Sequence, residues 1–572
     1  MSTSKDNQVT GEDRPADSRA LSRRGFLGGV GGAAAMAVAG AAGLEPLANP
    51  SELDVTAAVD APGRVRRAGS WKLRKDAADY WHGFQPARHP TNGDETRFPN
   101  RIGNFHKGLP HNGFGEVEPA AYQSLLDAVA SGDPDDFDAI VLSGPNKLTC
   151  PQGGLAFDLE GADSHAIAVP APPSIASAEM GGEGVEHYWM SLLRDVNFLD
   201  YRDNEDVAAA CADLNRFGAS FKGPKRQGRV TPQTLFRDVV PGGLIGPYIS
   251  QFMWLNTPFG TEYVERRQRT LLSGTDHLTS YDNWLAVQNG HFPESSAADF
   301  DPVRRYIRNG RDLAQWVHID VLFQAYFNAC LILGTPPSTD PLSGGLGAPP
   351  NPGNPYIDNP TQIGFTTFGP PHFKALLCEV ASRALKVTWH KKWQVHRRLR
   401  PEVWGGLVHH QRTSGRYPGV IDSRQLDSPA LDRVFSENGT YLLPMTFPEG
   451  SPTHPSYTAG HATVAGACVT ILKALFDEDY VIPDPVVAAP DGLSLVPYTG
   501  PALTVGGELN KLASNVATGR NIAGVHWRSD AIESLRAGEA LAISILRDQR
   551  ACYNERFGGF TFTRFDGTRI TV

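Results

Sequence analysis

The sequence is poor in cysteine, with six residues in a chain of 572. They lie far apart, so the chain is not a small disulfide scaffold, and a hydrophobic core must stabilise the fold. No Cys-x-x-Cys pair is present, which argues against zinc and iron–sulfur motifs. Pairing among Cys150, Cys211 and Cys552 stays open. Three cysteines lie in apolar helical patterns and are expected to be buried free thiols: Cys330, Cys378 and Cys468.

The chain also lacks a long basic run. It has 53 Lys plus Arg against 62 Asp plus Glu, a net charge of −9, and we expect no nucleic-acid partner. Any anion site must therefore be local. Hydrophobic residues make up 41% of the chain, with 27 Phe, 16 Tyr and 10 Trp, which is enough to bury a large core.

An apolar run of span-like character occurs only near the N-terminus. The motif SRRGFL at 22–27 precedes a Gly- and Ala-rich run at 28–44, which is typical of a twin-arginine export signal. The alternative is a basic tail followed by a single membrane anchor, but the run is short for a stable span. We expect cleavage near Ala48, no membrane segment in the mature form, and an extracellular, periplasmic or cell-envelope location.

Helical spacing of apolar residues recurs along the chain, whereas strand patterns are rare. The sequence therefore predicts an all-α helical bundle. We expect a signal peptide at 1–48 and a single large helical domain at 49–572, with an active-site half at about 371–550. The expected helices cover residues 186–201, 205–217, 311–333, 371–399, 459–476, 507–522 and 527–549.

The first motif with chemical potential lies at 389–401. Steps of three, four and four residues would place Trp389, Lys392, His396 and Arg400 on one helix face. Pro401 would end that helix. Two cations and a histidine on one face suit a multiply charged oxyanion. A solvated basic face is the alternative interpretation of this stretch taken alone.

The second motif, at 452–463, is a turn that leads into an apolar helix. Gly460 would let the backbone approach a ligand, and the first-turn N–H groups would face an anion. His461 would then lie beside that anion as a general acid or base. The alternative is a histidine that merely caps a core helix.

The third motif lies at 520–530. Arg520 would end one helix and His526 would begin the next, so that both could point into the same pocket. Asp530 follows His526 by four residues and is spaced to orient its imidazole.

Together the three motifs resemble the vanadium haloperoxidases, relatives of the bacterial acid phosphatases and lipid phosphatases. The resemblance is close over the motifs and looser from about residue 180 to the end. It implies a helical bundle, vanadate without heme, and oxidation of a halide by hydrogen peroxide to a hypohalous species that halogenates a small organic acceptor. A homodimer is also expected from the resemblance. The implied vanadate-binding residues are Lys392, Arg400, Gly460 and Arg520.

The same resemblance implies that His526 binds vanadium, that His461 is the acid/base, and that Lys392 polarises bound peroxide. The eight-residue step from Lys392 to Arg400, together with His454, is similar to the algal bromoperoxidases. Bromide is therefore favoured and chloride is the second candidate. The residues implied to line the halide approach or support the site are Trp389, His396, His454 and Asp530.

The sequence departs from the family at one position. Most members have Ser-Gly-His, whereas this chain has Ala459 before Gly460 and His461. One hydroxyl donor is missing, at an expected cost of about 1.5–3 kcal/mol of oxyanion binding.

Two alternatives to a haloperoxidase remain open. An acid phosphatase could use His526 as nucleophile and His461 as leaving-group acid, although related soluble phosphatases are much shorter. A non-catalytic exported oxyanion-binding protein is the other, supported only by Ala459.

Overall fold

The computed structural model describes residues 63–293, 299–340 and 342–572. The chain divides into two compact units, Met1–Lys75 and Asp76–Val572. The predicted active-site half belongs entirely to the second unit.

The predicted signal peptide and its boundary with the mature domain lie outside the described residues. Both therefore stay predictions. Within the described part of the chain, no helix combines the length and the apolar character needed to cross a membrane.

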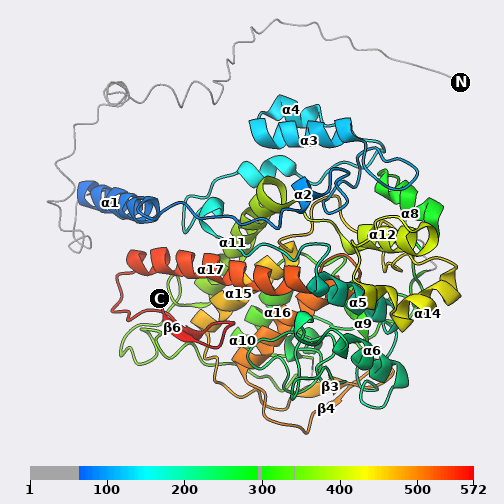
Figure 1. The fold of residues 1–572 in the computed structure, drawn as a ribbon. Helices are drawn as coiled ribbons and strands as arrows, with labels where there is room; N and C mark the ends of the chain where they lie inside the picture. Colours follow the sequence, from blue (N-terminus) through cyan, green and yellow to red (C-terminus); the bar gives the residue numbers. More distant parts are fainter. Residues whose placement is uncertain (1–62, 294–298, 341) are drawn as a thin grey trace, which may run out of the picture. The chain divides into compact units, whose positions relative to one another are not determined.

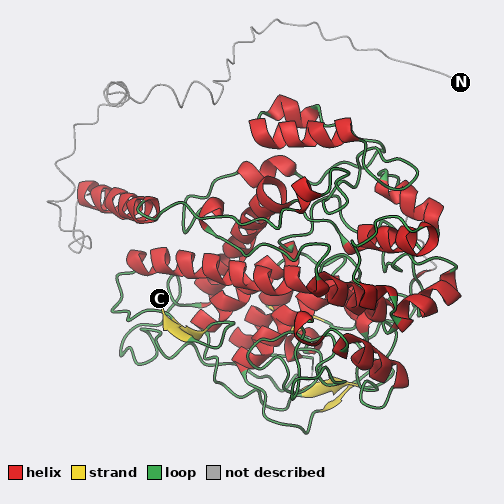
Figure 2. Ribbon diagram, viewed as in Figure 1, coloured by secondary structure: helices red, strands yellow, loops and turns green. Residues whose placement is uncertain are grey.

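Helices dominate the structure, and three short strand pairs lie among them (Figure 2). The predicted all-α bundle is confirmed. The α-helices are α1 Gly63–His82, α2 Asp94–Arg97, α3 Pro119–Ser131, α4 Pro134–Asp138, α5 Ala178–Leu192, α6 Glu205–Asn215, α7 Gln251–Trp254, α8 Tyr281–Gln288, α9 Gly310–Trp316, α10 Gln324–Gly334, α11 Pro370–Trp389, α12 Pro401–Ser414, α13 Ser423–Leu426, α14 Pro429–Asn438, α15 Gly460–Leu475, α16 Val505–Ile522 and α17 Arg528–Cys552.

The described residues also form short strands and short helices of other types. Each sheet is an antiparallel pair, β1 with β2, β3 with β4 and β5 with β6. The strands are β1 Thr257–Phe259, β2 Glu262–Val264, β3 Val486–Ala488, β4 Leu495–Pro497, β5 Thr561–Thr563 and β6 Arg569–Thr571. The 3-10 helices are η4 Pro151–Leu155, η5 Ser164–Ala166 and η6 Gly218–Ser220, and η8 His390–His396 is a π-helix.

Helix α15 is the centre of the bundle and packs against α17, α11, α16 and α10 (Figure 1). Every residue of α15 except His461 is buried. Glycines let α15 and α17 approach closely: a Cβ at Gly466 would lie 2.0 Å from the Leu535 carbonyl oxygen, and a Cβ at Gly538 would lie 2.0 Å from that of Thr463. This packing fixes the first turn of α15, which belongs to the second motif.

Two predicted helices outside the three motifs differ from the structure. Helix α5 begins at Ala178 because the Ser177 side chain accepts a hydrogen bond from the Met180 amide, a capping signal that periodicity alone missed. The predicted helix at 311–333 is two helices, α9 and α10. The apolar spacing continues through the break between them, since Val317 is buried and Phe323 is partly buried.

No disulfide joins the six cysteines, all of which lie in the described part of the chain. Cys330 and Cys468 are buried, as expected, while Cys378 is only partly so. Neither Cys150 nor Cys552, both exposed, forms a disulfide.

Candidate active site

The structure brings the three sequence motifs together around buried cations. The side chain of Lys392 is fully buried. Its ammonium donates hydrogen bonds to the backbone oxygens of Pro455 and of Ser456, the latter at 2.9 Å. The first motif is thereby joined to the second. Burial and the positive charge of Arg400 hold the pKa of Lys392 well below its usual range.

Arg400 links all three motifs. Its guanidinium donates to the backbone oxygen of His454 through Nε at 2.9 Å and Nη2 at 2.8 Å, and to that of Val525 at 2.6 Å. Nη1 lies 3.0 Å from Nε2 of His526, and Nη2 lies 2.8 Å from Nδ1 of His454. Arg400 is fully buried, and this burial lowers its pKa to about 9.

Arg520, near the end of α16, is the third buried cation. Its Nη1 donates to the Val317 carbonyl oxygen at 2.9 Å, and its Cζ lies 5.8 Å from the Phe447 ring centroid. Its Nε is buried without a hydrogen-bond partner among the described residues, as is the hydroxyl of Thr458 in the second motif. Burial lowers the pKa of Arg520 to about 10.

The three cations share one electrostatic property. Within the described ranges, neither Lys392, Arg400 nor Arg520 has a carboxylate at ion-pair distance, and each is held by main-chain oxygens. None of the three charges is therefore neutralised by a direct ion pair, although Asp530 lies near Lys392 and Arg400, and Asp320 near Arg520. An oxyanion would supply both the missing charge and the missing acceptor for Arg520 Nε, so these residues fit a group such as vanadate.

His526 is oriented by Asp530. Nδ1 of His526 lies 3.1 Å from Oδ2 of Asp530, and Ser456 donates its hydroxyl to the same carboxylate oxygen. Oδ1 of Asp530 accepts a 2.7 Å bond from Arg398. Burial, then Arg400, keeps the pKa of His526 well below its usual range. A neutral ring that donates from Nδ1 keeps its lone pair on Nε2, the atom that would act as a ligand and that here accepts from Arg400 Nη1.

Asp530 also begins helix α17. It occupies the third helical position, and its Oδ2 accepts a 3.0 Å bond from the Trp527 amide. A carboxylate at this place satisfies an otherwise unpaired amide and interacts favourably with the helix dipole. The predicted contact between Asp530 and His526 is present, and the start of α17 holds both residues in register.

His461 pairs with a residue that the sequence motifs did not reveal. Its Nε2 lies 3.0 Å from Oδ1 of Asp320, and the His461 side chain is 18% exposed. Asp320 lies in the break between α9 and α10, inside a segment interpreted as continuous helix. No spacing signal connects it to the motif at 452–463.

The first motif is not one continuous helix face, contrary to the interpretation of the sequence. Helix α11 ends at Trp389, the π-helix η8 follows, and Arg397 has a φ of 41°. A π-helix bonds residue i to i+5, which breaks the spacing of three and four. Arg400 instead precedes α12, and Pro401 begins that helix and does not end the previous one.

The residues predicted to line the halide approach divide into two groups. The Trp389 ring lies 4.8 Å from the His454 ring, and Lys392 Nζ lies 6.0 Å from the Trp389 ring centroid. His396 packs against Tyr457 at 4.8 Å, and both its ring nitrogens are buried without partners in the described part of the chain. Trp389 and His454 are therefore beside the cations, whereas His396 contacts the ring of Tyr457 in the second motif.

Helix α15 begins at Gly460, close to the predicted start at residue 459, and no side chain caps its first turn. Ala459 precedes the helix, and its amide donates to the Ser534 hydroxyl at 2.8 Å. A Cβ at Gly460 would meet Trp389 at 3.6 Å and Leu385 at 3.7 Å, which are ordinary contacts. Packing within the protein thus does not by itself require glycine at position 460.

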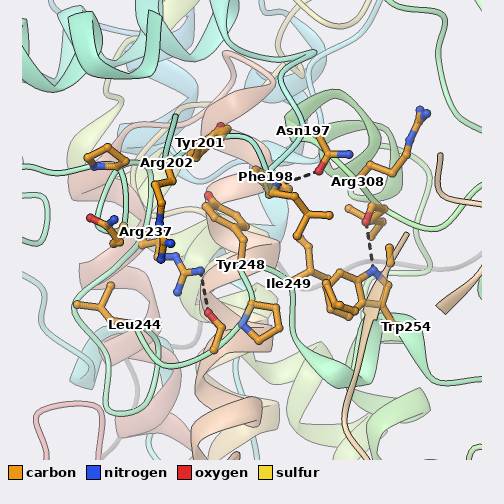
Figure 3. A pocket seen from close by; sticks show the side chains of 18 of the residues that line it. Asn197, Phe198, Tyr201, Arg202, Arg237, Leu244, Tyr248, Ile249, Trp254 and Arg308 are labelled. Carbon is orange, nitrogen blue, oxygen red and sulfur yellow. Dashed lines mark hydrogen bonds between the residues drawn. The ribbon is translucent and has the colours of Figure 1, made fainter. Parts of the chain in front are cut away.

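A cavity of about 370 Å³ lies elsewhere in the second unit (Figure 3). The rings of Phe198 and Tyr248 stack there at 3.9 Å, and Arg237 donates to the Gly243 carbonyl at 3.1 Å. None of the predicted site residues lines this cavity. The chemistry of the three motifs is therefore separate from it.

Known proteins of one family resemble this chain over most of its length. A family model for the VCPO second helical-bundle domain matches residues 380–555. The vanadium-dependent bromoperoxidase of Corallina pilulifera is 36% identical over 568 residues, 83% of this chain and 91% of that protein. The vanadium-dependent bromoperoxidase of Ascophyllum nodosum is 35% identical over 495 residues, 82% of this chain and 86% of that protein.

A solved structure gives the same result. The second vanadate-dependent bromoperoxidase of Ascophyllum nodosum, described as homohexameric, matches with a TM-score of 0.83 at 34% identity and covers 92% of this chain and 93% of its own. The resemblance drawn from the three motifs is confirmed. The chain belongs to the vanadium-dependent bromoperoxidases, within the haloperoxidase family.

Proposed function

We propose that this protein binds vanadate at the buried cation cluster and uses hydrogen peroxide to oxidise bromide. One observation carries the proposal: three buried cations, none ion-paired with a carboxylate of the described residues, lie in the motifs around an oriented His526 whose Nε2 faces Arg400 at 3.0 Å. Vanadium(V), when bound, supplies Lewis-acid activation of peroxide without a change in its own oxidation state.

The protein's own residues divide the remaining work. Lys392, Arg400 and Arg520 neutralise the oxyanion and hold its oxygens by charge-assisted hydrogen bonds. The side chain of His461 is 18% exposed, and Asp320 holds its Nε2. It is therefore placed to accept a proton from incoming peroxide through its other nitrogen.

The halide assignment has narrower support. Trp389 and His454 form an aromatic wall beside Lys392 and Arg400, and the two relatives compared by sequence are named as bromoperoxidases. We propose bromide as the preferred halide and chloride as the second candidate. The product is a hypohalous species that halogenates small organic acceptors.

The test is bromination of monochlorodimedone by the purified protein with hydrogen peroxide, before and after addition of orthovanadate. Chloride and p-nitrophenyl phosphate are assayed in parallel, and His526→Ala is the matched variant. We expect bromide turnover that depends on vanadate and is absent in the variant, whose circular dichroism is unchanged. Hydrolysis of the phosphate ester without halogenation would instead assign the chain to the phosphatase branch.

Self-association forms a second part of the proposal. The matching Ascophyllum nodosum structure is described as homohexameric, and the sequence resemblance leads us to expect a homodimer. We propose that the chain forms a homo-oligomer with the dimer as its smallest unit. Light scattering coupled to size exclusion measures this directly, and a mass of one chain at micromolar concentration would refute it.

A further inference from the structure

Behind the imidazole of His526 lies a second buried carboxylate, Glu183 of helix α5. Arg398 stands between it and Asp530. The Arg398 guanidinium donates to Asp530 Oδ1 at 2.7 Å through Nη1, and its Nη2 lies 3.5 Å from Glu183 Oε2. Its side chain is 1% exposed. One buried cation therefore faces two carboxylates.

Ser529 makes this connection continuous. Its amide donates to Glu183 Oε1 at 2.9 Å, and its hydroxyl donates to Glu183 Oε2 at 2.9 Å. The same hydroxyl accepts a 2.8 Å bond from Arg398. Since Asp530 in turn holds His526, a chain of hydrogen bonds runs from Glu183 to the predicted vanadium ligand.

The charges along this chain do not balance when both acids are ionised. Glu183 and Asp530 then carry two negative charges against the single positive charge of Arg398. Of these groups Glu183 binds a proton most readily, because burial raises its pKa to about 7 and the nearby carboxylates oppose its ionisation.

A cavity lies one helical turn from Glu183. Glu179, one turn earlier on α5, is half-buried and lines a cavity of about 440 Å³ together with Tyr457 and Ser529. Burial raises the pKa of Glu179 as well. Glu179 therefore lies at the cavity, and Glu183 lies one turn further along α5 in the interior.

We propose that Glu183 is a positioning residue of the vanadium-dependent reaction: through Arg398 it sets the negative charge that supports His526, and it takes up a proton when vanadate binds. This inference rests on the proposed vanadate site. The physical reason is Coulombic, since an incoming anion disfavours a second buried negative charge on the same network.

The groups that face Glu183 define what can disturb its titration. They are Glu179 on α5, Arg398 before α12, and Arg528, Ser529 and Asp530 on α17.

One turn later on α5, Glu186 is also buried, but it belongs to a different ion-pair group with Arg528 and Asp238. Among the described residues, Glu186 forms no hydrogen bond or ion pair with Arg398 or Asp530. It is therefore a matched control on the same helix.

The sign of the effect follows from these charges. Below about pH 7 Glu183 is neutral, and vanadate meets only the charge of Asp530 balanced by Arg398. Above about pH 7 Glu183 is ionised, and its charge repels the anion, so vanadate binding weakens as pH rises through this region.

The experiment is calorimetric titration of orthovanadate into the metal-free full chain between pH 6 and pH 8.5, in two buffers of different ionisation enthalpy. The variants are Glu183→Gln, Glu179→Gln and the control Glu186→Gln. Each curve is compared with the unmodified protein at the same pH, which cancels the ionisation of free vanadate. Circular dichroism verifies folding of every variant.

We expect the unmodified protein and Glu186→Gln to take up roughly half a proton from Glu183 on binding vanadate near pH 7. Glu183→Gln should lose this uptake, and at pH 8 it should bind vanadate roughly three- to tenfold more tightly than the unmodified protein, with no difference at pH 6. Glu179→Gln removes a neighbouring negative charge and should move the midpoint to lower pH.

The outcomes are separable. Equal proton uptake and equal pH dependence in Glu183→Gln and the unmodified protein would overturn the role of Glu183 while leaving the vanadate site intact. If Glu183→Gln does not fold, an unmoved midpoint in Glu179→Gln has the same meaning. No vanadate binding by any folded form would overturn the proposed function and this inference together.

Discussion

Restoring the missing hydroxyl is the most direct perturbation of the site. Ala459 precedes α15, is 2% exposed, and has backbone angles of φ −79° and ψ 124°. This extended conformation is the one that serine adopts at a helix N-cap. Ala459→Ser should therefore be accommodated, and its hydroxyl can accept from a first-turn amide while it donates to an oxyanion.

The two roles have different magnitudes and different readouts. The cap should stabilise the metal-free protein by about 0.5–2 kcal/mol, seen as a higher melting temperature without vanadate. A hydrogen bond to a charged oxygen should add about 1.5–3 kcal/mol of binding, which lowers the vanadate dissociation constant roughly 10- to 100-fold. Calorimetric titration of the metal-free protein measures the second effect.

Ala465→Ser is the control, because Ala465 is fully buried in the same helix but lies beyond its first turn. It should produce neither gain. If Ala459→Ser raises the melting temperature while vanadate affinity stays unchanged, the hydroxyl caps the helix without reaching the oxyanion, and the assignment of position 459 to the vanadate site would be refuted.

Three further predictions concern proton transfer, pH stability and export. Asp320→Asn should lower bromination kcat about tenfold or more while vanadate affinity changes little, since His461 loses the carboxylate that orients it; unchanged steady-state kcat would contradict this. Burial lowers the pKa of His396 to about 3, so its contribution to stability is present above its unfolded pKa of about 6.5 and is lost as pH falls. His396→Gln should therefore reduce the loss of unfolding free energy between pH 7.5 and pH 5.5 by about 1.4 kcal/mol in urea titrations, and an unchanged loss would argue against a buried neutral ring. Replacing Arg23 and Arg24 with lysine should retain the protein in the cytoplasm of its host, as measured by fractionation, whereas continued export would refute the twin-arginine signal.

Much of the site could be predicted from the sequence because its residues are local to helix ends. Gly460 and His461 begin α15, and His526 lies four residues before Asp530, so short spacing rules were sufficient to place them. Lys392 and Arg400 were also identified, although the reason given for their proximity was wrong. The π-helix η8 and the turn at Arg397 deliver Arg400 to the site, and a regular helix pattern does not reveal such a change.

What the sequence did not reveal depends on contacts between distant segments. Asp320 meets His461 across 141 positions of the chain, and its helix break was hidden by continued apolar spacing. Arg398 carried no sequence signal for a role in the site, and only the structure shows that it is buried and supports Asp530. Glu183 carried no motif at all. Residues of this kind can be recognised only from the folded structure, which shows that they are buried and which few side chains they contact.

Main-chain oxygens accept hydrogen bonds from Lys392, Arg400 and Arg520, and this arrangement affects the protein before vanadate binds. Carbonyl groups are fixed by the fold, so the cations stay close together in a dry interior with or without an anion, and their mutual repulsion is stored as lost folding free energy. A bound oxyanion relieves this repulsion. Independently of its source, binding to the folded state alone adds about 2.7 kcal/mol of stability when the ligand is at a hundredfold excess over its dissociation constant. Resistance to heat thus becomes a gauge of occupancy, and phosphate, which shares the tetrahedral oxyanion form, should compete for the same place in any buffer that contains it.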